Sequence, residues 1–100
     1  MTVEQLTAEE RDSWLSGLKG WTLAREGKAI ARTFEFGDFS EAFAFMTRVA
    51  MIAEARDHHP EWFNVYNKIE VTLTTHDVDG VSEKDVELAR FMDELVAKLV

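Results

Sequence analysis

Cysteine is absent from this 100-residue chain, and proline occurs only once, at Pro60. Without cysteine there is no disulfide, thiolate metal site or cysteine nucleophile, which fits a reducing compartment. Basic residues are also few, because 11 Lys and Arg stand against 19 Asp and Glu, for a formal net charge of -8 at pH 7. This charge repels phosphate backbones and anionic membrane surfaces. It argues against direct binding to nucleic acid or membranes.

Long hydrophobic runs are missing as well. No stretch of the sequence approaches the roughly 20 apolar residues that span a bilayer. The polar start MTVEQLTAEERD lacks the basic and apolar regions of a secretory signal, so we expect a cytoplasmic protein. Apolar residues make up 46% of the chain and charged residues 30%, as in ordinary folded proteins. The length suits a single domain over residues 1–100.

Local signals in the first half of the chain predict a helix followed by a hairpin. Thr7 and Glu10 have the spacing of a capping box, so a helix should begin there. Gly17 or Gly20 could end it in the left-handed conformation. The apolar alternation on both sides of REGK, residues 25–28, predicts two antiparallel strands joined by a turn.

The sequence from residue 38 onward predicts a long helix, a strand and a C-terminal helix. The segment DFSEAFAFMTRVAMIAEARD has helical periodicity, with Asp38 or Ser40 placed to cap it. NVYNKIEVTLTTH alternates like a strand, with Val65 on its apolar face. Ser82 and Asp85 then repeat the capping spacing before the last helix. This order of elements predicts an α+β fold with helices on one face of an antiparallel sheet.

The predicted central helix carries two apolar stripes. The first contains Ala42, Met46, Val49, Ala50 and Ala53, and the second contains Ala44, Phe45, Met51, Ile52 and Ala55. Both stripes could be covered within one domain, but a chain of this size has little material for that. Since surplus apolar surface commonly marks an interface, we expect the second stripe to form a subunit contact.

The histidines lie in two short segments that both flank turns. His58 and His59 stand directly before Pro60, and His76 ends the predicted strand. Imidazole is the side chain that titrates near neutral pH, and loops and strand ends commonly carry sites. Spacing alone does not bring the three rings together, so the fold would have to.

Two chemical interpretations of these histidines remain open. One is metal-free general acid–base catalysis, with the nearby carboxylates of Glu54 and Asp57 holding the rings. The other is a zinc site of three histidines and a water, although adjacent ligands are geometrically awkward. Asp85 is explained most simply as the capping partner of Ser82. For the aromatic residues Trp62, Phe63 and Tyr66, core packing is the simplest explanation. Trp21 could pack in the core or could equally stack on a flat heterocycle.

The segment from Glu54 to Asp85, EARDHHPEWFNVYNKIEVTLTTHDVDGVSEKD, resembles the signature of the pterin-4a-carbinolamine dehydratase family. It contains HHP, a Trp, NVYN, an alternating strand, a THD turn and S-x-x-D. The segment FEFGDFSEAFAFMTRVAMIAE and the early Gly20-Trp21 are also similar to the family, so the likeness covers nearly the whole chain. It implies the order α-β-β-α-β-β-α, with a four-stranded antiparallel sheet and helices packed on one face. The additional strand would be a short one around residues 62–64.

The resemblance also implies an activity and a site. Family members are hydro-lyases that dehydrate 4a-hydroxytetrahydropterin to quinonoid dihydropterin, without metal or organic cofactor, and so recycle the tetrahydropterin that aromatic amino acid hydroxylases consume. Carried over, His58 and His76 form the acid–base pair and His59 mainly orients the pterin. The implied substrate-binding residues are these three histidines with Pro60, Thr75, Asp77 and Val78, and the implied supporting residues are Glu54, Asp57, Trp21 and Asp85.

Members of the family associate as dimers or tetramers, which fits the second stripe of the central helix. In animals a relative also serves as a dimerisation cofactor of a homeodomain transcription factor. A non-enzymatic protein-binding module is therefore the alternative function. The acidic net charge permits it, since such a cofactor acts through another protein and not through DNA.

Overall fold

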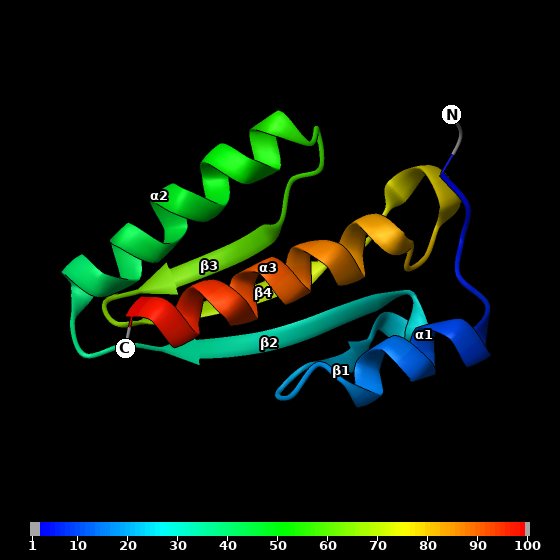
Figure 1. Cartoon of the computed structure of the whole chain (residues 1–100), viewed down its shortest axis with the longest axis horizontal. Coiled ribbons are helices and arrows are strands. Elements are labelled where there is room, and N and C mark those ends of the chain that lie inside the picture. The colour runs from blue at the N-terminus through cyan, green and yellow to red at the C-terminus, as the bar shows by residue number, and fades with distance from the viewer. Residues whose placement is uncertain (1–2, 100) are drawn as a thin grey trace.

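The computed structural model describes residues 3–99 and has the predicted α-β-β-α-β-β-α order (Figure 1). The elements are α1 (Ala8–Ser16), β1 (Thr22–Ala24), β2 (Ala29–Glu35), α2 (Phe39–Ala55), β3 (Glu61–Val65), β4 (Lys68–Leu73) and α3 (Glu83–Leu99). Two one-turn 3-10 helices, η1 (Arg25–Gly27) and η2 (His76–Val78), follow β1 and β4. The predicted fold class is confirmed.

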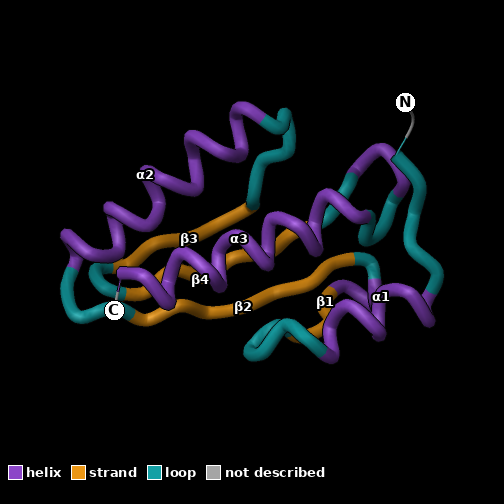
Figure 2. Tube along the Cα trace, viewed as in Figure 1, coloured by secondary structure: helices purple, strands orange, loops and turns teal. Residues whose placement is uncertain are grey.

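The four strands form one antiparallel sheet in the order β1-β2-β4-β3, shown as the orange segments in Figure 2. β4 lies inside the sheet, and its side chains alternate between the two faces as strand geometry requires. Ile69, Val71 and Leu73 are buried, whereas Lys68 and Glu70 are exposed. One face of the sheet therefore carries the core.

Both long helices pack on that same face, because their buried residues belong to one cluster with the strand residues. α2 contributes Phe45 and Val49, and α3 contributes Leu88 and Met92. At roughly 1.5–3 kcal/mol for each large apolar side chain removed from water, this cluster is the main stabilising feature of the fold.

The helix starts follow the predicted local rules. Thr7 and Glu10 form both hydrogen bonds of the capping box at α1. Of the two candidate caps for α2, Asp38 is the one that accepts a hydrogen bond from the Glu41 backbone amide, at 2.8 Å. Gly17 ends α1 in a right-handed conformation, and the left-handed turn comes later, at Gly20 with φ 86°. The chain needs glycine at that second position to reverse towards β1.

The prediction of one long strand from Val65 is wrong, while the division into a short and a long strand is confirmed. Val65 ends β3 and is 56% exposed. Tyr66 and Asn67 then form a two-residue turn, because Val65 pairs with Lys68 in the hairpin. Tyr66 adopts a positive φ of 51° in this turn, a conformation favoured by glycine or asparagine. The left-handed position thus carries a tyrosine, so the Asn-Gly or Asp-Gly pair that usually predicts a two-residue hairpin turn is missing there.

The buried face of α2 differs in part from the predicted stripes. Ala42, Val49 and Ala53 are buried as expected, but so is Phe45, which the sequence analysis placed on the second stripe. Ala50, placed on the first stripe, is exposed. The buried positions recur three or four residues apart, as a helical repeat requires. The buried face of the helix is therefore rotated toward Phe45 compared with the predicted first stripe. Three large apolar residues face outward instead: Phe39, Phe43 and Met51.

Candidate functional site

A cavity of about 220 Å³ lies where the segment after α2 meets the turn after β4. Its lining residues come from these two segments and from the first turn of α3: Asp57, His58, His59, Thr74, Thr75, His76, Asp77 and Lys84. All three histidines of the chain therefore line one cavity, as the catalytic hypothesis requires.

The β3–β4 hairpin explains why distant histidines meet. Glu61, two residues after His59, pairs with Thr72, four residues before His76. Because the hairpin is antiparallel, the start of β3 and the end of β4 lie at the same end of the sheet. The segments that carry His59 and His76 are therefore neighbours in space.

His58 is held by a buried carboxylate. Its Nε2 atom lies 2.6 Å from Oδ1 of Asp85, which is fully buried in the first turn of α3. The other oxygen, Oδ2, accepts hydrogen bonds from the Thr75 hydroxyl at 2.7 Å and from the Ser82 backbone amide at 2.9 Å. An ionised carboxylate only accepts hydrogen bonds, so Nε2 of His58 carries the proton. Asp85 thus caps α3, as predicted, and also orients a site histidine.

The second ring nitrogen of His58 is open to the cavity. No hydrogen-bond partner of Nδ1 is present among the described residues. In the same part of the chain, no buried side-chain nitrogen or oxygen lacks a partner. Nδ1 therefore reaches solvent, and because Nε2 holds the proton of the neutral ring, Nδ1 is the free proton acceptor.

His59 lies at the rim of the cavity, with its side chain 56% exposed. Its Nε2 atom is 2.7 Å from Oε1 of Glu54 in the last turn of α2. Between the two, Asp57 adopts a left-handed φ of 51°, and the His58 backbone amide donates to the carbonyl of Ala53 at 3.0 Å. The way in which α2 ends therefore directs both adjacent histidines towards the cavity.

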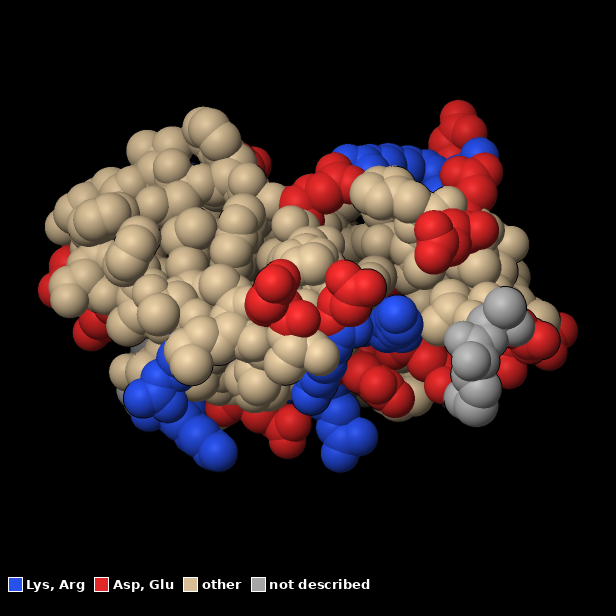
Figure 3. Space-filling view, turned by 90° about the horizontal axis from the view of Figure 1, so that it is seen from above, with Lys and Arg blue, Asp and Glu red and all other residues tan. Residues whose placement is uncertain are grey.

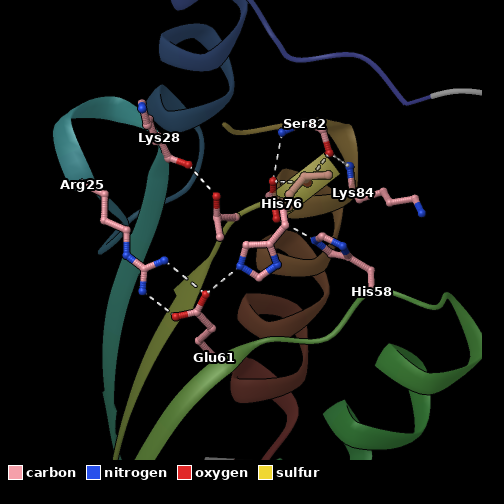
Figure 4. A network of polar contacts seen from close by, with 10 residues as sticks. Arg25, Lys28, His58, Glu61, His76, Ser82 and Lys84 are labelled. Atoms are coloured by element: carbon pink, nitrogen blue, oxygen red, sulfur yellow. Dashed lines mark hydrogen bonds and ion pairs between the residues drawn. The ribbon is translucent and has the colours of Figure 1, made fainter. Parts of the chain in front are cut away.

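His76 is the most exposed of the three, at 80% of its side chain. Its Nε2 atom lies 3.3 Å from Oε2 of Glu61, the first residue of β3. Arg25 of η1 contacts both oxygens of that carboxylate, with a distance of 3.1 Å from Nη1 to Oε2 (Figure 4). Hydrogen bonding from Arg25 holds the pKa of the Glu61 carboxyl below its ordinary value, against an opposing effect of burial.

The three histidines share one arrangement, because each presents Nε2 to a different carboxylate: Asp85, Glu54 or Glu61. A carboxylate partner fixes the orientation of an imidazole and decides which nitrogen carries the proton. For His58 and His59, whose Nε2 atoms are hydrogen-bonded, Nδ1 is then the atom that the ring can offer to a ligand. A cavity with several oriented imidazoles can both donate and accept protons.

The remaining predicted binding residues divide into two groups. Thr75 and Asp77 line the cavity, whereas Pro60 and Val78 are outside its lining. The hydroxyl of Thr75 already donates to Asp85 and lies 2.6 Å from Oγ of Ser82. Its one hydroxyl proton is therefore used within the protein, and Thr75 helps to position Asp85; its predicted role in substrate binding stays a prediction.

The aromatic residues lie away from the cavity. Trp21 is buried in the core and donates from Nε1 to Oδ1 of Asp93 at 2.8 Å, so its placement in the pocket was wrong. Trp62 packs partly buried against the core, as expected. Phe63 and Tyr66 are exposed, contrary to the core-packing interpretation.

Sequence reasoning missed Arg25, Glu61, Thr74 and Lys84. Thr74 and Lys84 are chain neighbours of Thr75 and Asp85, which was the available signal for them. Glu61 follows the HHP motif directly, but its contact with His76 depends on the hairpin. Arg25 had no local signal, because its approach to Glu61 depends on the backbone of η1.

The structure provides no metal-ligand cluster within residues 3–99, since no three histidine or acidic side chains there are placed to hold one ion. The same residues include no helix that combines the length and the apolar character needed to cross a bilayer.

Comparison with known proteins agrees with the motif. Residues 4–95 match the family described as pterin 4 alpha carbinolamine dehydratase. The chain belongs to this family. The predicted resemblance is thereby confirmed, over nearly the whole length of the chain.

Relatives from two bacteria carry a provisional pterin-4-alpha-carbinolamine dehydratase name. The protein from Novosphingobium aromaticivorans is 58% identical over 96 residues, which cover 96% of this chain and all of that protein. The protein from a Bradyrhizobium species is 59% identical over 97 residues, which cover 97% of each chain. A crystal structure of the transcriptional coactivator/pterin dehydratase from Brucella melitensis is similar with a TM-score of 0.87 and 49% identity, and the match covers 90% of this chain and 96% of that one.

Proposed function

We propose that this protein dehydrates a 4a-hydroxytetrahydropterin to the quinonoid dihydropterin by histidine acid–base catalysis. Membership of the family gives the reaction class. The observation that carries the proposal is the cavity lined by three imidazoles, each paired with a separate carboxylate. In this function the protein carries out one step in the recycling of the tetrahydropterin that an aromatic amino acid hydroxylase consumes.

The reaction requires two proton transfers. The C4a–O bond breaks as a general acid protonates the departing hydroxyl group, which leaves as water. A general base removes the proton from N5, and the electron pair of that bond forms the N5=C4a double bond. One group gains a proton while another loses one, so solvent exchange restores both after each turnover. Positioned acids and bases each contribute about 10²–10⁴-fold to such a rate.

We assign the acid–base pair to His58 and His76 and the orientation of the pterin to His59. His58 has an open Nδ1 and a buried carboxylate behind it. His76 lies on the η2 side of the same cavity, so the pair approaches a ligand from two different segments. Asp77 and Lys84 add one charge of each sign to the lining, which suits a flat ligand with hydrogen-bond donors and acceptors on its edge. The chemistry calls for no metal or organic cofactor.

A stopped-flow assay with enzymatically generated carbinolamine tests the proposal, because it separates the catalysed step from spontaneous dehydration. His58→Ala and His76→Ala should each lower kcat about 10²-fold or more. Asp79→Asn is the control, since Asp79 pairs with Lys28 and does not line the cavity, and asparagine tolerates its left-handed φ of 49°. If both histidine variants turned over like the wild-type protein, the catalytic proposal would be wrong.

The outer face of α2 supports a proposal of homo-oligomerisation, as a dimer or tetramer. Beside this helix lies a mostly apolar groove of about 680 Å³, lined by Phe43, Met46, Thr47, Ala50, Met51, Glu54 and Trp62. Figure 3 shows an uncharged expanse on the side of the molecule where α2 lies. Light scattering should give a smaller particle for Phe43→Glu than for wild-type protein. Leu23→Glu, an exposed position on β1, is the control.

The same face favours a second candidate function, a protein-binding module. The Brucella melitensis relative is described as a coactivator as well as a pterin dehydratase. In a pull-down with a defined partner protein, His58→Ala should retain binding and Phe43→Glu should lose it. Loss of binding in both variants would contradict a function that is separate from the catalytic cavity.

A further inference from the structure

A chain of charged side chains connects the β1–β2 turn to the histidine cavity. Arg25 in η1 contacts Glu61 at the start of β3, and Glu61 contacts His76 in η2 (Figure 4). The three residues come from three separate elements. They meet because β2 and β3 both pair with β4, which places the starts of β2 and β3 and the end of β4 at one end of the sheet.

The backbone of η1 adopts an unusual conformation at this place. Arg25 and Glu26 have positive φ angles of 51° and 58°, and Gly27 follows with 87°. Left-handed backbone is unfavourable for residues with a Cβ atom, and such outliers are frequent at functional sites. Here the turn directs the Arg25 side chain towards the end of the sheet that carries the cavity.

The contact between Arg25 and Glu61 fixes the carboxylate in one orientation. Nη1 donates to Oε2 and Nη2 donates to Oε1, a two-pronged arrangement that a planar guanidinium group forms and a lysine does not. Oε2 of Glu61 is shared between Nη1 of Arg25 at 3.1 Å and Nε2 of His76 at 3.3 Å. Arg25 therefore holds Oε2 through a contact that does not involve His76.

We propose that Glu61, held by Arg25, is a positioning residue that orients His76 for proton transfer. The imidazole of His76 is largely exposed, so packing does not hold its ring. A carboxylate held 3.3 Å from Nε2 favours the tautomer that carries the proton on that nitrogen, which leaves Nδ1 for the ligand. This inference rests on the proposed function, because it assigns a partner to one of the two proposed acid–base groups.

The surroundings of His76 also contain other charged or titratable groups. Those that line the same cavity are Asp57, His58, His59, Asp77 and Lys84. The Lys28–Asp79 pair lies at the end of η2, because Asp79 directly follows that turn. Within residues 3–99, however, Glu61 is the acidic side chain that lies within ion-pair distance of the His76 ring. The effect on His76 should therefore be specific to Glu61 and to the arginine that holds it.

The test combines steady-state kinetics with nitrogen NMR of the His76 ring. Glu61→Ala should lower kcat about tenfold with little change in KM, since it disturbs the geometry of a proton-transfer group without removing it. The neutral ring should show a larger Nδ1–H fraction than in the wild-type protein. Arg25→Met should act in the same direction and add nothing in the Glu61→Ala background. Arg25→Lys should recover only part of the loss, and Lys28→Met is the control for removal of a nearby positive charge.

A kcat for Glu61→Ala within about twofold of the wild-type value would overturn the positioning role, since a misplaced catalytic group costs more than that. Additive losses in the Arg25→Met/Glu61→Ala double variant would overturn the claim that Arg25 acts through Glu61. An inactive wild-type protein would instead refute the proposed function. In that case the ring tautomer still decides whether Glu61 orients His76, because that measurement needs no turnover.

Discussion

Replacing Asp85 with asparagine should move the proton of His58 from one ring nitrogen to the other while keeping the shape of the site. Two donors, the Thr75 hydroxyl and the Ser82 amide, approach Oδ2 at 2.7 and 2.9 Å, and a carbonyl oxygen can accept both. The amide NH₂ group of asparagine would then occupy the place of Oδ1, 2.6 Å from Nε2 of His58. Because NH₂ donates hydrogen bonds, Nε2 must become the acceptor. The proton of the neutral ring then moves to Nδ1, which is the atom open to the cavity.

The expected consequence is a large loss of turnover with a modest loss of stability. A histidine in the wrong tautomer cannot accept a proton through the exposed nitrogen, so kcat should fall by about 10²–10³-fold. Replacing charge-assisted hydrogen bonds with neutral ones should cost about 1–3 kcal/mol of unfolding free energy. Stopped-flow kinetics, chemical unfolding and nitrogen NMR of His58 measure the three effects separately.

Asp93→Asn is the matched control for Asp85→Asn. Asp93 belongs to the same helix and accepts hydrogen bonds from Trp21 at 2.8 Å and from Arg32 at 2.6 Å. It is not part of the cavity lining, so its replacement should reduce stability and spare kcat. Wild-type turnover in Asp85→Asn, with the NMR signal of an Nδ1–H ring, would refute the reasoning about His58.

Two further predictions concern stability. The lowered pKa of Glu61 means that its ion pair with Arg25 stabilises the fold above the ordinary carboxyl range and that this contribution is lost as pH falls through the folded-state pKa. Unfolding free energies of wild-type and Glu61→Gln protein should therefore differ slightly near neutral pH and converge in acid, and a difference that grew in acid would contradict the sign. Phe45→Ala should lower the free energy of unfolding by about 3–5 kcal/mol. The Phe45 ring is buried, and its centroid lies 4.8 Å from that of Phe34 and 5.2 Å from that of Phe36. Phe43→Ala, at an exposed position of the same helix, should cost far less, and equal losses in urea unfolding would contradict the assignment of the two faces.

Features that depend on a few neighbouring residues could be predicted from the sequence. The capping pair Thr7–Glu10 is a local set of hydrogen bonds, so its spacing was sufficient, whereas spacing left Asp38 and Ser40 as alternatives for the cap of α2 and the structure selects Asp38. The turn at Tyr66 was missed because its left-handed backbone is imposed by pairing on both sides and not by a turn residue. The face of α2 that contains Phe45 was also missed, since the position of the sheet decides which helical side is covered.

The candidate site was predictable to the extent that the motif carried it. The HHP and THD segments identified all three histidines, and Glu54 was placed beside them from chain proximity. The pairing of His58 with Asp85 joins residues that are 27 positions apart. It was not predicted, because helix capping already explained why an aspartate stands at position 85. Arg25 lies in another hairpin altogether. Contacts of this kind are created by the packing of complete elements, so no spacing rule reveals them.

Asp85 both caps α3 and holds His58, so the proposed catalysis depends on the local order of the first turn of α3. Ser82 donates its amide to the same carboxylate that anchors His58, so fraying of the first helical turn would release the ring at the same moment. Hydrogen exchange at that turn should then rise and fall with the fraction of competent enzyme across a series of variants. A substitution in the last helix could in this way abolish the proposed activity without lying in the cavity.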